Sequence, residues 1–279
     1  MSTTTLPAGP VSCHATPSRV CSDSRAPRRS LDADADADED EDEDEDAWWV
    51  TCFTVQLWRP IDANLASMSD ALRDQTRLAY DTVAASYAQI LPDTSYESPL
   101  DLAMIDHFVR QLGGRHVLDA GCGAGRMMTY LASGCESLTL AGVDLSPSMV
   151  ERARAGRPEA HIEEGDLAAL PFGGERFDGV LAWYSIIHSP PQELAPIFGE
   201  FRRILRPGAV ALIAYQAGTG VRDLTHAYGH DVELRAFLHQ PPDVEAVLHA
   251  TGFTVDSRLD RGARAAERHG QCFILATRS

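Results

Sequence analysis

The stretch VLDAGCGAGRMM, residues 117–128, constrains the fold of this chain strongly. A short apolar run leads into three glycines at alternate positions, Gly121, Gly123 and Gly125, and a helical pattern follows. Glycines permit a sharp turn and let a ligand approach the backbone closely. Because a helix starting here directs its free N–H groups at the loop, the segment predicts a ligand site between a strand and a helix.

Strand-like and helical patterns alternate around this loop. The strand-like runs cover residues 116–120, 138–144, 160–166, 177–185 and 209–215, and the helical stretches between them cover 125–133, 147–155 and 192–205. This alternation predicts βαβ units and a parallel sheet covered on both faces. After a helix over 242–251, two strands over 253–259 and 271–277 predict a hairpin at the sheet edge.

Two helices are expected before the loop. Helical periodicity runs from about residue 70 to Ile90, and Pro92 ends it. A second helix is expected from about Leu100 to Leu112, before a pair of glycines.

Residues 1–67 differ from the rest in composition. They hold 5 Arg and 14 acidic residues, mainly in the acidic run 32–46, which repels itself and predicts disorder. The aromatic segment 47–58 is open to three interpretations: an extra strand, a segment docked on the domain, or a stretch with no role. We expect 1–67 to be a dispensable leader or a mis-assigned start, and a folded domain to cover 68–279.

The composition of the folded part excludes several classes. Its 19 Arg against 27 acidic residues argue against nucleic acid as a partner, since phosphate binding needs a basic face. The six Cys show no CxxC pair and no zinc spacing, so we expect no metal site and interpret them as free thiols in the cytoplasm. No apolar run is long enough to cross a membrane, and no signal-peptide core is present. The oligomeric state is not indicated.

Three acidic residues stand at the ends of successive predicted strands. Asp119 precedes the glycine loop, while Asp144 and Asp166 end the next two strands. Because ligands of open α/β sheets bind at the carboxyl ends of the strands, these carboxylates should share one ligand. Asp144 can accept both hydroxyls of a ribose, and Asp166 can accept from an adenine amino group. The GxGxG spacing disfavours the dinucleotide fingerprint GxGxxG.

These segments resemble the successive motifs of class I S-adenosylmethionine-dependent methyltransferases. They are VLDAGCGAG, GVDLSPSMVERAR, GDLAALPFGGERFDGVLAWYSIIH and EFRRILRPGAVALIAY, and the resemblance extends over roughly residues 75–279. It implies a Rossmann-like, doubly wound α/β fold with a seven-stranded, mostly parallel sheet and an antiparallel C-terminal hairpin. The domain over 68–279 would then use S-adenosyl-L-methionine.

The resemblance also implies an enzyme that methylates a small-molecule acceptor. We expect this enzyme to act in secondary metabolism. An oxygen acceptor is the first expectation. Transfer to carbon or nitrogen, and a non-catalytic binding module that keeps the cofactor fold, are the alternatives.

Carried over position by position, the resemblance assigns residues to the parts of the cofactor. The loop from Asp119 to Gly125 would hold the methionine moiety, Asp144 the ribose, and Asp166 the adenine. A tyrosine of the first helix, Tyr87 or Tyr80, would cover the methionine end. The expected cofactor-binding residues are Tyr87, Asp119, Ala120, Gly121, Cys122, Gly123, Gly125, Asp144, Leu145, Met149, Asp166, Leu167 and Trp183.

His188 is the candidate catalytic residue. It ends the fourth predicted strand, and a hydroxyl acceptor needs a base. The alternative is a histidine that hydrogen-bonds a backbone carbonyl. Residues 216–240 are interpreted as part of a substrate lid, together with the first two helices. The Arg-rich stretch 258–270 is either a solvated loop or a contact for an anionic substrate.

Overall fold

The computed structural model describes residues 63–279, with side chains from residue 68 onward. The proposed leader therefore lies outside the described residues, except for 63–67, the start of the first helix, α1 (Ala63–Ile90). The segment 47–58 also lies outside them. Among residues 63–279, no helix combines the length and the apolar character that a membrane crossing requires.

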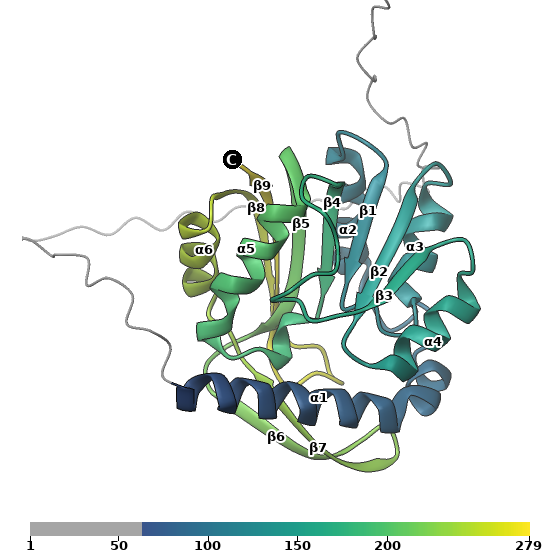
Figure 1. Cartoon of the computed structure of the whole chain (residues 1–279), viewed down its shortest axis with the longest axis vertical. Coiled ribbons are helices and arrows are strands. Elements are labelled where there is room, and N and C mark those ends of the chain that lie inside the picture. The colour runs from purple at the N-terminus through teal and green to yellow at the C-terminus, as the bar shows by residue number, and fades with distance from the viewer. Residues whose placement is uncertain (1–62) are drawn as a thin grey trace, which may run out of the picture.

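A seven-stranded sheet forms the centre of the domain (Figure 1). Its strand order is β3-β2-β1-β4-β5-β9-β8; β1 to β5 pair in parallel, and β9 lies antiparallel between β5 and β8. The strands are β1 His116–Ala120, β2 Thr139–Asp144, β3 His161–Glu164, β4 Phe177–Trp183, β5 Leu205–Ala217, β8 Phe253–Arg261 and β9 Gly270–Arg278. The fold class is confirmed, including the C-terminal hairpin.

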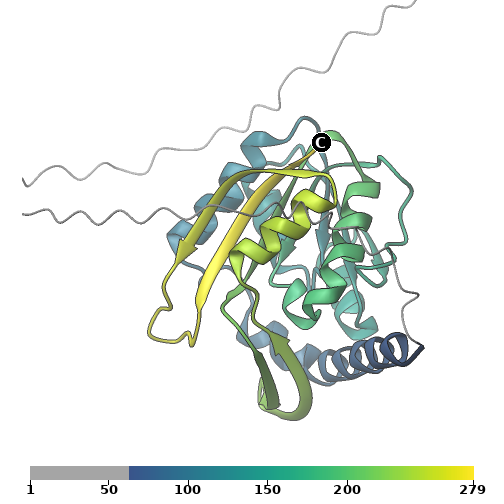
Figure 2. The ribbon, with the colours of Figure 1, turned by 90° about the vertical axis from the view of Figure 1, so that its left-hand side faces the viewer.

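Helices cover both faces of this sheet (Figure 2). One hydrophobic core contains side chains of α2 (Pro99–Gln111), α3 (Arg126–Gly134) and α4 (Pro147–Gly156). The other contains side chains of α5 (Leu194–Ile204) and α6 (Pro241–Ala250). Because the central strands are buried on both sides, they read in the sequence as continuous apolar runs.

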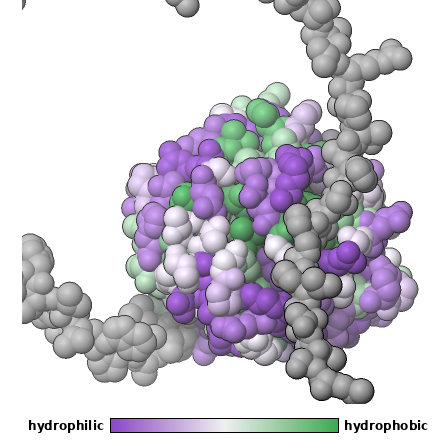
Figure 3. All heavy atoms as spheres, turned by 90° about the horizontal axis from the view of Figure 1, so that it is seen from above, coloured by the Kyte–Doolittle hydropathy of each residue, from purple (hydrophilic) through white to green (hydrophobic). Residues whose placement is uncertain are grey.

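A second layer closes one end of the sheet. Figure 1 shows α1 lying across this end, with the hairpin of β6 (Val221–Ala227) and β7 (His230–Phe237) beside it. Val232 and Leu234 of β7 pack against Ala79 and Val83 of α1. Figure 3 shows the opposite end of the molecule, where hydrophilic residues surround a smaller group of hydrophobic ones.

The hairpin β6–β7 was not expected as regular structure, since 216–240 was interpreted only as a lid. The sequence carried two signals: apolar residues at every second position, Val232, Leu234 and Ala236, and a glycine, Gly229, just before them. In the structure these three apolar side chains are buried, and Tyr228 and Gly229 have φ values of 50° and 84°, as a two-residue hairpin turn of type I′ requires.

The fourth strand ends earlier than expected, at Trp183. Tyr184 has a φ of 56°, in the left-handed region, which stops the strand. His188 therefore lies in a short 3₁₀ helix, η1 (Ile186–His188), rather than at a strand end. Among the cysteines that the structure describes, Cys122 and Cys272 are free thiols, as predicted, and both are buried. Cys135 is not a free thiol, contrary to the prediction.

Arg261, at the end of β8, holds α2 against the loop that connects β8 to β9. Its guanidinium donates to both oxygens of Asp101, at 2.6 and 2.7 Å, and to both oxygens of Glu267, at 2.6 and 2.9 Å. Asp101 is fully buried in the first turn of α2. The bonds to Arg261 lower the pKa of Glu267 to about 2.

Replacement of this cation should destabilise the fold. In Arg261→Ala, Asp101 stays buried without its cation, so we expect a loss of about 3–5 kcal/mol, measured by thermal unfolding at pH 7. Arg258→Ala is the matched control, because Arg258 is exposed and pairs with Glu245 and Asp260 on the surface; it should cost about 1 kcal/mol or less. Equal losses in the two variants would contradict the role assigned to Arg261.

Candidate functional site

The glycine loop turns sharply between β1 and α3. Gly121, Gly123 and Gly125 have φ values of 80°, 52° and 87°, a region that favours glycine. A Cβ at Gly121 would lie 2.3 Å from the Cβ of Ser185, so no side chain fits there. The requirement for glycine at this turn is therefore both conformational and steric.

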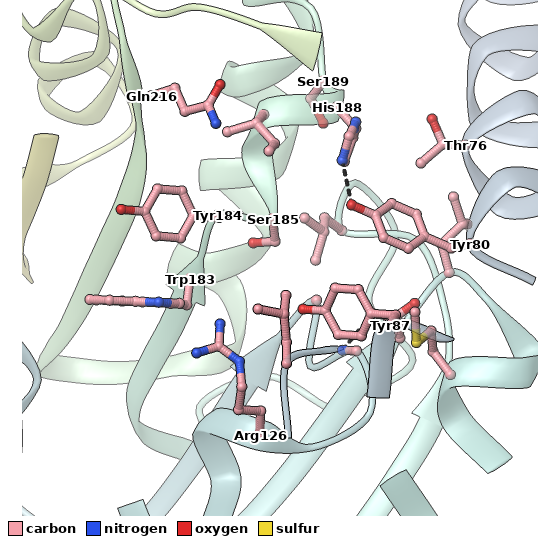
Figure 4. A pocket seen from close by; sticks show the side chains of 18 of the residues that line it. Thr76, Tyr80, Tyr87, Arg126, Trp183, Tyr184, Ser185, His188, Ser189 and Gln216 are labelled. Atoms are coloured by element: carbon pink, nitrogen blue, oxygen red, sulfur yellow. Dashed lines mark hydrogen bonds between the residues drawn. The ribbon is translucent and has the colours of Figure 1, made fainter. Parts of the chain in front are cut away.

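A cavity of about 520 Å³ opens at the carboxyl ends of the strands, between this loop, the end of β4 and α1 (Figure 4). This volume lies within the range of ligand pockets. His188 lines it, and so do nine of the thirteen residues expected to bind the cofactor: Tyr87, Gly121, Gly123, Asp144, Leu145, Met149, Asp166, Leu167 and Trp183. The other four, Asp119, Ala120, Cys122 and Gly125, do not line the cavity.

Asp144, at the end of β2, supports the loop. One carboxylate oxygen accepts from the Gly123 amide at 2.8 Å, and the other accepts from the Ser146 amide at 2.9 Å. Each oxygen of a carboxylate has two lone pairs, so Asp144 keeps acceptor sites for a pair of ligand hydroxyls. Burial raises the pKa of this carboxyl, while the two backbone bonds oppose that shift.

Asp166 makes a contact that the sequence did not reveal. Its Oδ2 pairs with Nε of Arg73, on α1, at 2.9 Å, and its Oδ1 accepts from the Ala168 amide. Arg73 also pairs with Glu193, so it joins α1 to two loops at the strand ends. The apolar side chains of Leu145, Met149 and Leu167 line the same cavity, as the adenine assignment requires.

Asp119 is buried beneath the loop, and neither of its oxygens has a hydrogen-bond partner among the described residues. Burial raises its pKa to about 7; the charge of Asp144 adds to the shift, and Arg126 opposes it. A buried, unpaired carboxylate beside a glycine loop favours a positively charged ligand group nearby. This arrangement fits the methionine end of S-adenosylmethionine, which carries an ammonium and a sulfonium.

The ring of His188 is held from both sides. Its Nδ1 lies 2.7 Å from the carbonyl oxygen of Arg235, on β7, and its Nε2 lies 2.8 Å from the hydroxyl of Tyr80. Because a carbonyl only accepts, Nδ1 carries the proton, and Nε2 accepts from Tyr80. Burial lowers the pKa of His188 to about 4, so the ring is neutral at pH 7. The bond to a backbone carbonyl is the alternative that the sequence left open.

Both tyrosines predicted from α1 line the cavity, on the side opposite Tyr184 and Gln216 (Figure 4). The ring of Tyr87 packs edge-on against Tyr228 with ring centroids 5.0 Å apart. Tyr228 occupies the turn of the β6–β7 hairpin, so this contact joins the hairpin to α1 beside the glycine loop.

Several lining residues were missed, and for some of them a signal existed. The missed Arg73 and Thr76 precede the predicted Tyr80 and Tyr87 on α1. These four residues are separated by three, four and seven positions, which places them on one helical face. No local pattern indicates several other polar lining residues, whether they adjoin predicted ones, as Arg126 and Ser185 do, or lie in other segments: Glu97, Gln216, Arg264, Glu267 and Gln271.

The histidines of the predicted lid lie away from the cavity. His239 is buried with Nε2 near the Ile186 carbonyl, and His226 pairs with Asp231. In the part of the chain that the structure describes, no three His, Cys, Asp or Glu side chains are grouped to hold a metal ion. From the Arg-rich stretch, Arg264 does reach the cavity.

Comparisons with known proteins point to one kind of enzyme. A family model described as "Methyltransferase domain" matches residues 117–208. A malonyl-[acyl-carrier protein] O-methyltransferase of Salmonella typhimurium is 29% identical over 198 residues, which cover 69% of this chain and 72% of that protein. An O-methyltransferase of Aspergillus sclerotiorum is 28% identical over 222 residues, covering 71% of this chain and 78% of that protein.

Solved structures show the same fold. A SAM-dependent methyltransferase of Methanosarcina mazei is 17% identical with a TM-score of 0.55, covering 65% of this chain and 97% of its own. A TehB-like SAM-dependent methyltransferase of Corynebacterium glutamicum is 21% identical with a TM-score of 0.52, covering 72% of this chain and all of its own.

The raised pKa of Asp119 predicts a stability effect with a definite sign. The pKa is about 7 in the folded protein and about 4 in an unfolded chain, so ionisation of Asp119 destabilises the fold as pH rises through this range. Asp119→Asn does not titrate, so we expect it to be more stable than the wild type by roughly 2–4 kcal/mol at pH 8 and by much less at pH 5.

Thermal unfolding at both pH values measures this difference. Asp106→Asn, which removes an exposed carboxylate of α2, controls for the loss of one negative charge. A gain that is the same at pH 5 and pH 8 would argue against ionisation of Asp119 as its cause.

Proposed function

The chain belongs to the class I S-adenosylmethionine-dependent methyltransferases, and we propose that within this family it transfers the methyl group to an oxygen atom of a small-molecule acceptor in the cytoplasm. The single observation that carries the proposal is the convergence of Gly123, Asp144 and Asp166 on one cavity. Two of the relatives described above are O-methyltransferases, which supports oxygen as the acceptor atom.

We propose that the residues around the cavity hold the cofactor in three parts. Asp144 would accept from the ribose hydroxyls, and Asp166 would accept from the adenine amino group between apolar side chains. The glycine loop, Asp119 and Tyr87 would hold the methionine end. When bound, the cofactor supplies a methyl group that its sulfonium already activates.

The chain itself must then orient the acceptor and exclude water. Helix α1 and the β6–β7 hairpin lie over the carboxyl ends of the strands, where they cover the cavity (Figure 1). His188 joins these two elements, because it bonds Tyr80 of α1 on one side and the backbone of β7 on the other.

Residues 1–67 are proposed to be dispensable for this activity. Because α1 (Ala63–Ile90) begins before Met68, removal of residues 1–67 would also remove the first turn of this helix.

Calorimetry tests the cofactor assignment directly. We expect S-adenosylhomocysteine to bind the full chain and NAD to give no heat. Asp144→Asn should weaken nucleoside binding about ten- to hundredfold, since bonds to a charged acceptor contribute about 1.5–3 kcal/mol. Asp74→Asn, an exposed carboxylate of α1, is the matched control and should bind as the wild type does. Unchanged affinity in Asp144→Asn would refute the ribose assignment.

Substitution of His188 tests its place in the site. We expect His188→Ala to lower turnover at least tenfold while the affinity for S-adenosylhomocysteine stays within about twofold, because the ring fixes Tyr80 beside the acceptor. Tyr80→Phe removes the same hydrogen bond from the other partner, so the two variants and their double variant should lose similar activity. Wild-type turnover in His188→Ala, with cofactor affinity intact, would remove this residue from the proposal.

A further inference from the structure

We infer that the side-chain amides of Gln216 and Gln271 hold the acceptor by a neutral edge in which a carbonyl oxygen stands beside an N–H or O–H donor. The inference rests on the proposed function and narrows its substrate class. Two features carry it: the amides lie side by side at the end of the cavity that the cofactor assignment leaves free, and they present one donor and one acceptor.

The two glutamines stand on neighbouring strands. Gln216 is near the end of β5, Gln271 is near the start of β9, and the two are paired across these antiparallel strands. Side chains paired in this way leave the same face of a sheet, with Cβ atoms about 5 Å apart. Both residues line the cavity, so one ligand group can reach both amides.

This pair lies apart from the groups assigned to the cofactor. The glycine loop, Asp144 and Asp166 lie at the ends of β1, β2 and β3, whereas β5 and β9 follow on the other side of β4 in the strand order. Because neighbouring strands are about 4.8 Å apart, the two amides lie roughly 10–15 Å across the sheet from β1. We therefore assign them to the acceptor and not to the methionine end of the cofactor.

The orientation of the Gln271 amide is fixed by one contact. Its Nε2 donates to the carbonyl oxygen of His269 at 2.9 Å, and a carbonyl only accepts, so the nitrogen must face His269. Its Oε1 is buried and has no hydrogen-bond partner among the residues that the structure describes, and the residue is 4% exposed. Because a buried carbonyl without a donor is unfavourable, this oxygen favours a ligand that donates.

The Gln216 amide is fixed in the opposite sense. The guanidinium of Arg222, on β6, donates to its Oε1 at 3.1 Å. A guanidinium only donates, so the oxygen must face Arg222 and the amide nitrogen points elsewhere. Figure 4 shows this nitrogen on the side of Tyr184, which also lines the cavity. Gln216 therefore presents an N–H beside the carbonyl of Gln271.

Charged side chains near this end of the cavity balance one another. Glu267, in the loop that leads into β9, pairs with Arg261 and Arg264, so a charge on the ligand is not needed to compensate them. A carboxylate has no proton for Gln271, and an ammonium has no acceptor for Gln216. A carboxamide, a lactam or a hydroxy ketone satisfies both amides and carries no charge.

Matched probes test this class of acceptor. Para-hydroxybenzamide carries the edge with an N–H donor, and para-hydroxyphenyl hydroxymethyl ketone carries it with an O–H donor. Para-hydroxybenzoate and its methyl ester lack the donor, and para-hydroxybenzylamine lacks the carbonyl. In calorimetry on the complex with S-adenosylhomocysteine, we expect the amide or the ketone to bind at least tenfold more tightly than these three. The tighter of the two identifies the donor of the acceptor.

Substitutions separate recognition from folding. Gln216→Glu replaces the donor by a second acceptor and keeps an oxygen for Arg222. We expect it to bind para-hydroxybenzamide at least tenfold more weakly than the wild type, and to bind para-hydroxybenzamidine, whose two nitrogens both donate, at least tenfold more tightly. Gln271→Met keeps the length of the side chain but removes its acceptor, so the advantage of the amide over the methyl ester should fall to about twofold or less.

Gln111→Met is the matched control, because Gln111 is exposed at the end of α2 and does not line the cavity. It should bind every probe as the wild type does. All three variants should keep the affinity for S-adenosylhomocysteine within about twofold, a result that a merely structural role of the two glutamines would not give.

The outcomes separate the two proposals. The inference is overturned if the acid, the ester or the amine binds as tightly as the amide and the ketone, if neither of these binds at millimolar concentration, or if the amide preference survives in both Gln216→Glu and Gln271→Met. In each of these cases, intact binding of S-adenosylhomocysteine leaves the cofactor assignment in place. Absence of that binding in the wild type overturns the proposed function itself.

Discussion

The bond from the Gly123 amide to the carboxylate of Asp144 connects the two halves of the site. It joins the loop after β1 to the end of β2, so the turn with positive φ values is held by a charged acceptor from the neighbouring strand. The other oxygen of the same carboxylate accepts a hydrogen bond from the amide of Ser146, the N-cap residue of α4. Since each oxygen keeps a lone pair, the group that shapes the loop also faces the cavity, and structure and ligand binding depend on one side chain.

Local patterns in the sequence were sufficient to predict the sheet, the loop and the positions of Asp144 and Asp166. They work because burial on both faces imposes apolar runs, and because carboxyl ends of parallel strands meet at one edge. The partner of Asp166 was not predictable in this way. Arg73 lies 93 residues earlier in the sequence and reaches Asp166 only because α1 folds back across the strand ends. Pairing between remote segments leaves no mark in a local window.

His188 shows a second limit of sequence reasoning. Its position after β4 indicated correctly that it lines the cavity, but the role of an imidazole depends on what its two nitrogens meet. One partner belongs to α1, and the other is a backbone carbonyl of β7, a strand that was expected as irregular chain. Every residue has a backbone carbonyl, so no sequence motif indicates which one accepts this hydrogen bond. The protonation state of His188 therefore followed from the fold and not from its neighbours in the sequence.

The buried acids of the site also indicate how function and stability compete here. Asp119 and Asp144 lie close enough that the charge of Asp144 raises the pKa of Asp119, and neither oxygen of Asp119 has a hydrogen-bond partner among the described residues. A sequence selected for stability alone would place an apolar or amide side chain at Asp119. Under the proposed function, a cationic ligand group bound near the glycine loop would stabilise this charge, and its binding would return part of the free energy that folding loses.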